Sequence, residues 1–119
     1  MLNLNKENKN SYKRGEIYWV VFIVEGKKTT YPCLVISNDV QNQISKYLVI
    51  LPVVITENLP KISFHVEIII EGKKAVIIPE RIHYIHKDKL ANFLEKLNQK
   101  TMMEVEKALV SVLKISSLK

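Results

Sequence analysis

The distribution of apolar residues along the chain predicts a protein built mainly from β-strands. The apolar runs long enough to form strands cover residues 16–24, 33–37, 47–55, 63–70, 74–79 and 81–85. The first run, EIYWVVFIV, is β-branched and aromatic, which is typical of a largely buried strand. The fourth run alternates, so Val66 and Ile68 share one face while His65 and Glu67 share the other.

Polar segments rich in turn residues separate these predicted strands. Residues 25–30 are expected to form a polar turn in which Gly26 adopts a positive φ, and residues 71–73 (EGK) indicate a tight hairpin. Residues 38–42 (NDVQN) are expected to form a loop, because Asn and Asp side chains hydrogen-bond their own backbone.

The period of the apolar positions changes near the C-terminus. Leu90, Phe93, Leu94 and Leu97 follow the spacing of an amphipathic helix. Asn98 is the expected N-cap of a second helix, whose apolar stripe consists of Met102, Val105, Leu109, Val112 and Leu113. Five or six strands followed by two helices predict a mainly β (α+β) fold, a small barrel or curled sheet with C-terminal helices packed on it. A parallel α/β fold is excluded, because no helix is expected between the strands.

Length and composition are those of one compact domain. The chain has 119 residues, of which 47% are apolar and 25% charged. Residues 1–11 (MLNLNKENKNS) show no usable period and are expected to form a flexible leader. The single domain is therefore expected to span residues 12–119.

The charge balance points toward acidic partners. The chain carries 18 Lys and Arg against 12 Asp and Glu, a net charge of +6. A basic surface attracts polyanions by electrostatic steering and counterion release. The same balance is compatible with a solvated, Lys-rich surface, so it supports nucleic acid as a partner without establishing it.

Cysteine content and hydropathy indicate a reducing, aqueous compartment. Cys33 is the only cysteine, which excludes an intramolecular disulfide and a Cys-based zinc site. The longest nearly apolar run, residues 48–55, is too short to span a membrane, and the polar N-terminus does not resemble a signal peptide. We therefore expect a cytoplasmic protein without membrane attachment.

The common catalytic motifs are absent from the sequence. It contains no phosphate-binding loop, dinucleotide fingerprint, zinc-protease helix or serine-hydrolase elbow. His83 and His86, three residues apart on a strand, are expected to point to opposite faces, so neither a metal site nor a cofactor is predicted. Cys33, at the head of an apolar strand, is expected to be a small buried hydrophobe.

Polar and basic side chains gather instead at the predicted strand ends. They are Lys27, Lys28, Thr29, Thr30, Tyr31, Thr56, Arg81 and His83. Groups of this kind can act on RNA without a metal. A base takes the ribose 2′-OH proton, a cation holds the scissile phosphate, and an acid protonates the leaving 5′-oxygen. By spacing alone, the same residues are also compatible with ordinary solvated strand ends.

Several segments, taken in order, resemble the MazF/PemK-like toxins of type II toxin–antitoxin systems. They are residues 13–20 (KRGEIYWV), 32–39 (PCLVISND) with Asn42, 65–68 (HVEI), 75–82 (AVIIPERI), 85–87 (IHK) and the helix-like 94–113. The resemblance implies an SH3-like β-barrel with helices, usually as a homodimer. It further implies a metal-independent endoribonuclease that cuts single-stranded RNA at short sequences and needs no cofactor. A cognate antitoxin with an acidic, disordered segment is the implied protein partner.

The resemblance also implies site residues. Family members commonly carry Arg immediately before the Pro of the second strand, where this chain has Tyr31, which supplies no permanent cation. The family's Thr or Ser at the end of the third strand corresponds to Thr56, whereas an ungapped alignment from His65 places Val54 there. The candidate catalytic residues are Thr56, Lys28 and His83. The candidate RNA-binding residues are Lys27, Tyr31, Arg81 and Asn38.

Two other functions stay open on the sequence. A barrel that has lost catalysis and binds RNA or an antitoxin is favoured by the absence of Arg before Pro32. A toxin that acts on a protein target such as a topoisomerase would use the C-terminal segment, residues 102–119.

Overall fold

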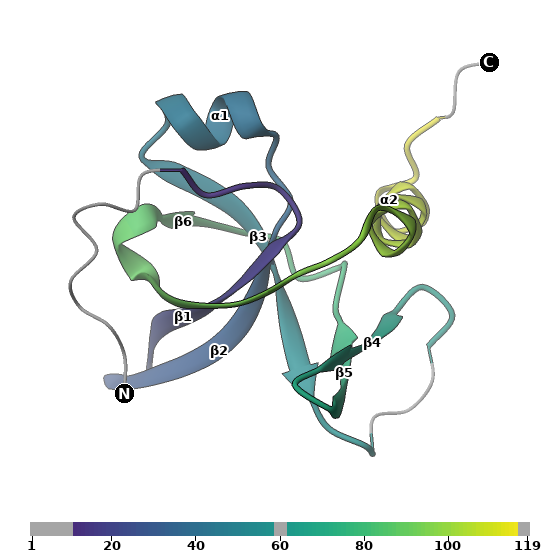
Figure 1. Ribbon diagram of the computed structural model, residues 1–119, viewed down its shortest axis with the longest axis horizontal. Coiled ribbons are helices and arrows are strands. Elements are labelled where there is room, and N and C mark those ends of the chain that lie inside the picture. Colours follow the sequence, from purple (N-terminus) through teal and green to yellow (C-terminus); the bar gives the residue numbers. More distant parts are fainter. Residues whose placement is uncertain (1–10, 59–61, 117–119) are drawn as a thin grey trace.

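The computed structural model describes residues 11–58 and 62–116 as a strongly curved antiparallel sheet with a helix beside it (Figure 1). The strands in these residues are β1 (Glu16–Val24), β2 (Lys27–Val35), β3 (Tyr47–Ile55), β4 (Val66–Ile70), β5 (Lys73–Ile77), β6 (His83–His86) and β7 (Leu90–Lys96). The helices are α1 (Asp39–Ile44), the 3₁₀ turn η1 (Lys87–Lys89) and α2 (Gln99–Leu113). The mainly β fold with a barrel-like sheet and a C-terminal helix is confirmed.

Strand β3 is shared by both halves of the sheet. The strand order is β4-β5-β3-β2-β1-β7, and β6 also pairs with β3. The first part of β3 pairs with β6 and β2, the last of these pairs being Cys33 with Pro52. From Val53 onward β3 pairs with β5 instead. The sheet therefore changes direction along β3, and β4 and β5 lie apart from the β1–β2 hairpin (Figure 1).

Strand alternation divides the apolar interior into two clusters. One cluster packs between the sheet and α2 and includes Ile17, Leu34, Leu51, Val53, Ile68, Ile77, Met102 and Val105. The other lies on the opposite face of β1, β2 and β3 and includes Tyr12, Tyr18, Val20, Cys33, Val35, Leu48, Ile50 and Leu90. Because successive side chains point to opposite faces, Ile17 and Tyr18 enter different clusters. Trp19, on the same strand, is only partly buried.

Helix α2 confirms the second predicted helix. The Asn98 side chain accepts a hydrogen bond from the Thr101 N–H at 2.8 Å, which is the geometry of an N-cap. Met102, Val105 and Ala108 form the buried stripe of the helix. The helix ends at Leu113, and its C-cap Lys114 has the left-handed backbone that commonly terminates a helix.

The first predicted C-terminal helix is wrong, because residues 90–96 form strand β7 beside β1. The pairing of β1 with β7 shifts register twice, between Ile17 and Tyr18 and between Tyr18 and Val20. These irregularities interrupt the two-residue alternation of a strand. The remaining spacing of Leu90, Phe93 and Leu94 then resembles that of a helix, although the backbone is extended.

The loop predicted at residues 38–42 is also wrong, since Asp39–Ile44 form α1. The Asn38 side chain accepts from the Gln41 N–H at 2.8 Å and caps this short helix. Asn42 is fully buried, and its side-chain amide donates to the Ser37 carbonyl at 2.9 Å. The polar residues that suggested a loop therefore form the cap and the anchor of a helical turn.

The remaining differences concern strand ends. The turn predicted over residues 25–30 is confined to Glu25 and Gly26, both at positive φ, and β2 already begins at Lys27. Strand β4 begins at Val66 rather than at residue 63, and β5 and β6 are displaced by one or two residues from their predicted ends. The predicted leader, apart from Ser11, lies outside the described residues.

Candidate functional site

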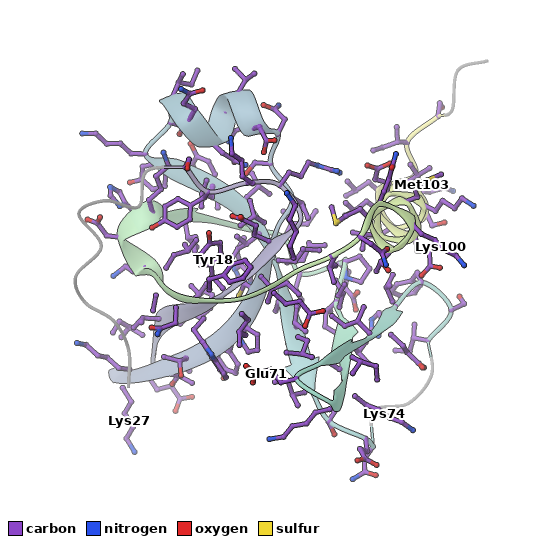
Figure 2. The ribbon with its side chains drawn as sticks, in the orientation of Figure 1. Tyr18, Lys27, Glu71, Lys74, Lys100 and Met103 are labelled. Atoms are coloured by element: carbon purple, nitrogen blue, oxygen red, sulfur yellow. The ribbon has the colours of Figure 1, made fainter. Side chains whose placement is uncertain are left out.

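The paired strands β2 and β3 separate after Pro52, and this fork positions the candidate site residues. Beyond the pair of Cys33 with Pro52, the earlier residues of β2 continue beside β1 alone, while β3 turns to β5. Strand β7 also leaves β1 at Val20. The far end of the β1–β2 hairpin, residues 21–31, therefore projects as a two-stranded arm, with Lys27 near its tip (Figure 2).

An aromatic cluster lies at the base of this arm. The Phe22 ring is 5.9 Å from the Tyr31 ring and 5.6 Å from the His83 ring, measured between centroids. Phe22 and Tyr31 belong to paired neighbouring strands, and His83 opens β6 opposite Ile50. Tyr31 and His83 are exposed, and Phe22 is partly buried beneath them. The fold thus joins two predicted site residues through Phe22.

The sequence does not single out Phe22, because residues 16–24 as a whole predict a largely buried strand. Two features of the sequence point to Phe22. It shares a face of the strand with Val20, and it lies closer than Val20 to the predicted turn. Side chains on that face of β1 change from buried at Val20 to partly buried at Phe22 and exposed at Val24. An aromatic residue at this transition marks the rim of the curved sheet.

The two lysines of the arm point to opposite faces. Lys27 pairs with Val24, and Tyr31 pairs with Val20, so both side chains lie on the face that carries Phe22. Lys28 pairs with Ile23 and lies on the other face. Of the two cations, the strand register therefore brings Lys27, rather than Lys28, to the side of Tyr31 and His83.

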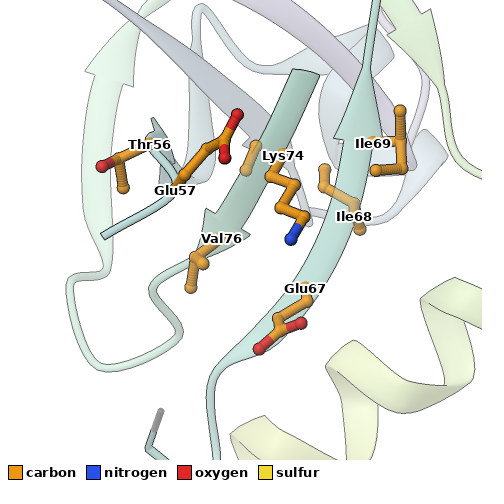
Figure 3. A pocket seen from close by; sticks show the side chains of 8 residues that line it. Thr56, Glu57, Glu67, Ile68, Ile69, Lys74 and Val76 are labelled. Atoms are coloured by element: carbon orange, nitrogen blue, oxygen red, sulfur yellow. The ribbon is translucent and has the colours of Figure 1, made fainter. Parts of the chain in front are cut away.

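Thr56 lines a separate pocket of about 380 Å³ on the sheet half formed by β3, β4 and β5. Its charged or polar lining residues are Thr56, Glu57, Glu67 and Lys74. The Lys74 side chain extends between Glu57 and Glu67, and Thr56 lies on the far side of the pocket from Glu67 (Figure 3). The Thr56 hydroxyl accepts the Asn58 N–H at 3.1 Å, which leaves its proton available for donation.

The aromatic cluster and the Thr56 pocket lie on the same side of β3. In the alternation of β3, Pro52 lies on the same face as Ile50, which belongs to the cluster that includes Tyr18. Thr56 follows Pro52 by four residues and continues this alternation. By the same register, Val54 is the residue that comes opposite Tyr31 if the β2–β3 pairing is extended by two residues. Tyr31 and His83 thus lie at one end of this face and Thr56 lies at the other end. The apolar residue Val54 lies between them.

Arg81 lies in the turn that connects the two sheet halves. Its N–H donates to the Ile78 carbonyl at 3.3 Å, and its side chain is exposed. The adjacent Glu80 carboxylate holds the His65 Nε2 atom at 3.0 Å. Partial burial favours a higher pKa for Glu80, but the hydrogen bond from His65, a backbone N–H and the positive charges of His65 and Arg81 outweigh it and lower the pKa. The contact between His65 and Glu80 thus connects the turn that contains Arg81 to the start of β4.

Asn38 and Cys33 have structural roles in this protein. The Asn38 side-chain oxygen is engaged at the α1 N-terminus, which lies at the opposite end of the view from the tip of the hairpin (Figure 1). Cys33 is fully buried, and burial raises the pKa of its thiol to about 12. A neutral, inaccessible thiol is not a nucleophile, which confirms the interpretation of Cys33 as a small hydrophobe.

Histidines and carboxylates form no metal-binding cluster of three or more residues within residues 11–58 and 62–116. His83 pairs with Ile50 and His86 with Tyr47, so the two imidazoles occupy opposite faces of β6, as predicted. In the same part of the chain, no helix is long and apolar enough to cross a membrane.

The sequence matches one protein family over most of its length. The family, described as PemK-like, MazF-like toxin of type II toxin–antitoxin systems, matches residues 13–113. No curated protein matches the chain significantly.

Solved structures show that the fold is shared with MazF proteins. A mycobacterial endoribonuclease in complex with its cognate antitoxin has a TM-score of 0.75 at 21% identity, over 91% of this chain and 100% of that chain. MazF from a MazE–MazF structure of Deinococcus radiodurans gives 0.75 at 20% identity, over 89% and 99%. A MazF toxin of Mycobacterium tuberculosis gives 0.73 at 11% identity, over 86% and 99%.

Proposed function

The chain belongs to the PemK-like, MazF-like toxin family of type II toxin–antitoxin systems, and from this premise we propose that it is a metal-independent endoribonuclease. Its substrate is single-stranded RNA, bound along the face of β3 that extends from the aromatic cluster to Thr56. The products carry a 2′,3′-cyclic phosphate and a 5′-OH.

The observation that supports this proposal is the contact of Tyr31 and His83 with the shared Phe22 ring. Exposed aromatic rings hold single-stranded RNA by stacking on its bases. An imidazole beside a stacked base is well placed to exchange a proton near neutral pH. The cluster therefore combines a base-binding surface with a proton-transfer group.

The proposed reaction is an in-line transfer within the RNA chain. His83 accepts the proton of the ribose 2′-OH while the O2′–P bond forms and the P–O5′ bond breaks. The leaving O5′ takes a proton from the Tyr31 hydroxyl, which solvent restores. The Thr56 hydroxyl donates a hydrogen bond to a neighbouring phosphate. Lys27 and Arg81 hold phosphate charge, and a contact of Lys28 with RNA stays a prediction because its strand position faces away from this cluster.

The proposed partners follow from the family and from the charge. Of the three solved structures named above, two contain an antitoxin, described as the cognate antitoxin in one and as MazE in the other. A chain with a net charge of +6 attracts both RNA and an acidic protein segment. We propose a cognate antitoxin with an acidic disordered segment, a homodimeric toxin and a cytoplasmic location.

The decisive experiment incubates the purified, antitoxin-free protein with mixed-sequence single-stranded RNA in EDTA and maps the fragment ends. Discrete cuts with 5′-OH ends are expected. In the His83→Gln variant the cleavage rate should fall by about 10²- to 10⁴-fold, the usual contribution of a general base. RNA affinity and melting temperature should change little, because His83 is exposed.

The matched control is Met103→Gln, which introduces the same amide on α2, away from Lys27 (Figure 2). This control should cut RNA at the wild-type rate. Equal cleavage by the His83→Gln variant would remove His83 from the mechanism, and intact RNA with folded wild-type protein would refute the nuclease proposal.

A second candidate function is a binding module that does not cleave. It is favoured by a specific observation: Tyr31 stands where the resembling toxins have Arg, and the hydroxyl residue Thr56 lines a separate pocket rather than lying beside Tyr31. Such a protein would hold RNA or sequester an antitoxin. RNA that is bound with micromolar affinity or better yet remains intact in EDTA and in Mg²⁺ would support this function over the nuclease.

A further inference from the structure

Two exposed tyrosines form a stacked pair on the outer face of β3 and β6. The Tyr47 and Tyr84 rings are 4.9 Å apart with planes inclined by 17°, and His86 packs edge-on against Tyr47 at 5.1 Å. Tyr84 remains 64% exposed and Tyr47 40% exposed. The pair thus presents a broad, preformed aromatic surface to solvent, named here the tyrosine platform (Tyr47 and Tyr84).

Lysines lie at the end of the tyrosine platform. Lys46 precedes Tyr47 in the chain, and its carbonyl accepts the N–H of Lys87 at 2.8 Å, so these two lysines come from adjoining backbone segments. Lys89 follows in η1. Asp88, the carboxylate between Lys87 and Lys89, lies 3.5 Å from His86 Nδ1. Three ammonium groups against one carboxylate give these adjoining segments, residue 46 and residues 87–89, a net positive charge.

The tyrosine platform is separated from the aromatic cluster only by the edge strand β6. Tyr84 pairs with Val49 and the preceding residue, His83, pairs with Ile50, so their side chains leave β6 on opposite faces. A chain that binds beside His83 and passes over the end of β6 therefore meets Tyr84 next.

We propose that the tyrosine platform binds a nucleobase of single-stranded RNA outside the cleavage site, with Lys46 and Lys87 contacting the flanking phosphates. This inference rests on the proposed RNA substrate and adds a second contact for the same strand. Every nucleobase has a flat π-face, so stacking tolerates sequence, and the lysines complement the phosphates without reading bases. The tyrosine platform therefore favours long substrates over short ones rather than particular sequences.

The test measures binding of 2′-O-methyl RNA, which lacks the nucleophilic hydroxyl and cannot be cut. Fluorescence anisotropy compares mixed-sequence oligonucleotides of about five and about fifteen nucleotides, the range of site sizes of single-strand binders. Tyr84→Leu should weaken binding of the longer RNA by about 5- to 100-fold, the usual effect of losing one stacked base. Tyr84→Phe keeps the aromatic face and should bind as the wild type does, and neither variant should affect the shorter RNA.

Phe93→Leu is the matched control, because Phe93 is an exposed aromatic residue on β7, outside the tyrosine platform. It should bind both RNAs as the wild type does. A photo-cross-link from 4-thiouridine RNA, mapped to Tyr84 or Tyr47, would support the proposal independently.

Several outcomes would overturn the proposal. Equal binding of the longer RNA by the Tyr84→Leu and wild-type proteins is one. Another is weaker binding of the longer RNA by the Phe93→Leu control as well as by Tyr84→Leu. A third is a Tyr84→Leu variant that changes the oligomeric state in sedimentation, which would identify a contact between copies of the chain. Failure of the cleavage proposal is distinguishable, because it appears with the wild-type protein in the RNA-cutting assay and leaves the binding of 2′-O-methyl RNA unchanged.

Discussion

Individual polar side chains in this protein act largely by connecting segments that are distant in the sequence. The Arg14 side chain donates from Nε to the Ile36 carbonyl at 3.0 Å and lies 3.0 Å from the Glu106 carboxylate. Its backbone N–H donates to Asp39 at 2.7 Å. Arg14 therefore joins the end of β2, α1 and α2. One of the two arginines of the chain is thus engaged in the fold, which leaves Arg81 as the exposed guanidinium near the candidate site.

Glu80 should make stability depend on pH in the acid range. Because the folded-state pKa of Glu80 is lowered from its ordinary value of 4.5, its contribution is present above pH 4.5 and lost as the pH falls through the folded-state value. The Glu80→Gln variant lacks this contribution. Urea unfolding over the acid range should show a stability difference from the wild type that is present above pH 4.5 and shrinks as the pH falls below that value.

Glu104→Gln, a change of an exposed carboxylate on α2, is the control for this measurement. Its difference from the wild type should vary with pH much less than that of Glu80→Gln. If the two variants show the same pH dependence, the His65–Glu80 pair does not stabilise the fold.

At the scale of elements, two hairpins with the same turn sequence organise the sheet. The β1–β2 and β4–β5 connections are both Glu-Gly, with φ of 51° and 79° in the first and 50° and 79° in the second. Positive φ at both central positions is typical of type I′ turns, in which Gly is favoured second and Asn or Asp first. Each turn thus holds a glutamate in a left-handed backbone conformation, which is energetically unfavourable for this residue type.

Replacing Glu71 by Asn should therefore stabilise the protein. Asn tolerates positive φ better than Glu does, and we expect a gain of about 0.5–1 kcal/mol in the free energy of unfolding. Glu71→Val, a β-branched residue in the same conformation, should instead lower stability. Urea unfolding of both variants checks the order. A Glu71→Val variant as stable as Glu71→Asn would show that this turn does not constrain the backbone as described.

At the scale of the whole molecule, α2 completes the core of a sheet that does not close on itself. The side chains of Met102, Val105 and Ala108 enter the cluster formed by both halves of the sheet. Gly15, just before β1, has φ of +96°, and a side chain there would lie 3.6 Å from Met102 Cγ. Helix α2 therefore stabilises the two sheet halves, whose separation along β3 creates the candidate site.

Two valines of α2 test this role. Val105 is fully buried, whereas Val110 on the same helix is 40% exposed. Val105→Ala should lower the free energy of unfolding by about 1.5–3 kcal/mol, through lost apolar burial and a cavity. Val110→Ala should change it by less than about 0.5 kcal/mol. Thermal or urea denaturation measures both, and equal effects would contradict the packing of α2 on the sheet.

The sequence alone determined most strands, the second helix and its cap, the burial of Cys33 and the resemblance to a toxin family. These features depend on local composition and period, which contiguous residues express. The helix predicted at residues 90–97 was wrong because irregular pairing with β1 removed the alternation that identifies a strand. The loop predicted at residues 38–42 was wrong for a similar reason, because the N-cap of a helix and a loop favour the same residue types.

Only the tertiary structure decided which candidate side chains meet. The register of β1 with β2 sends Lys27 and Lys28 to opposite faces, and the contact of Phe22 with His83 joins residues 61 positions apart. The exchange of partners along β3 places Thr56 in a pocket of its own. The contact of Phe22 with His83 and the place of Thr56 follow from strand pairing over longer sequence separations, which no local pattern encodes. The chain thus specifies its strands locally, and the pairing between them assembles the candidate site.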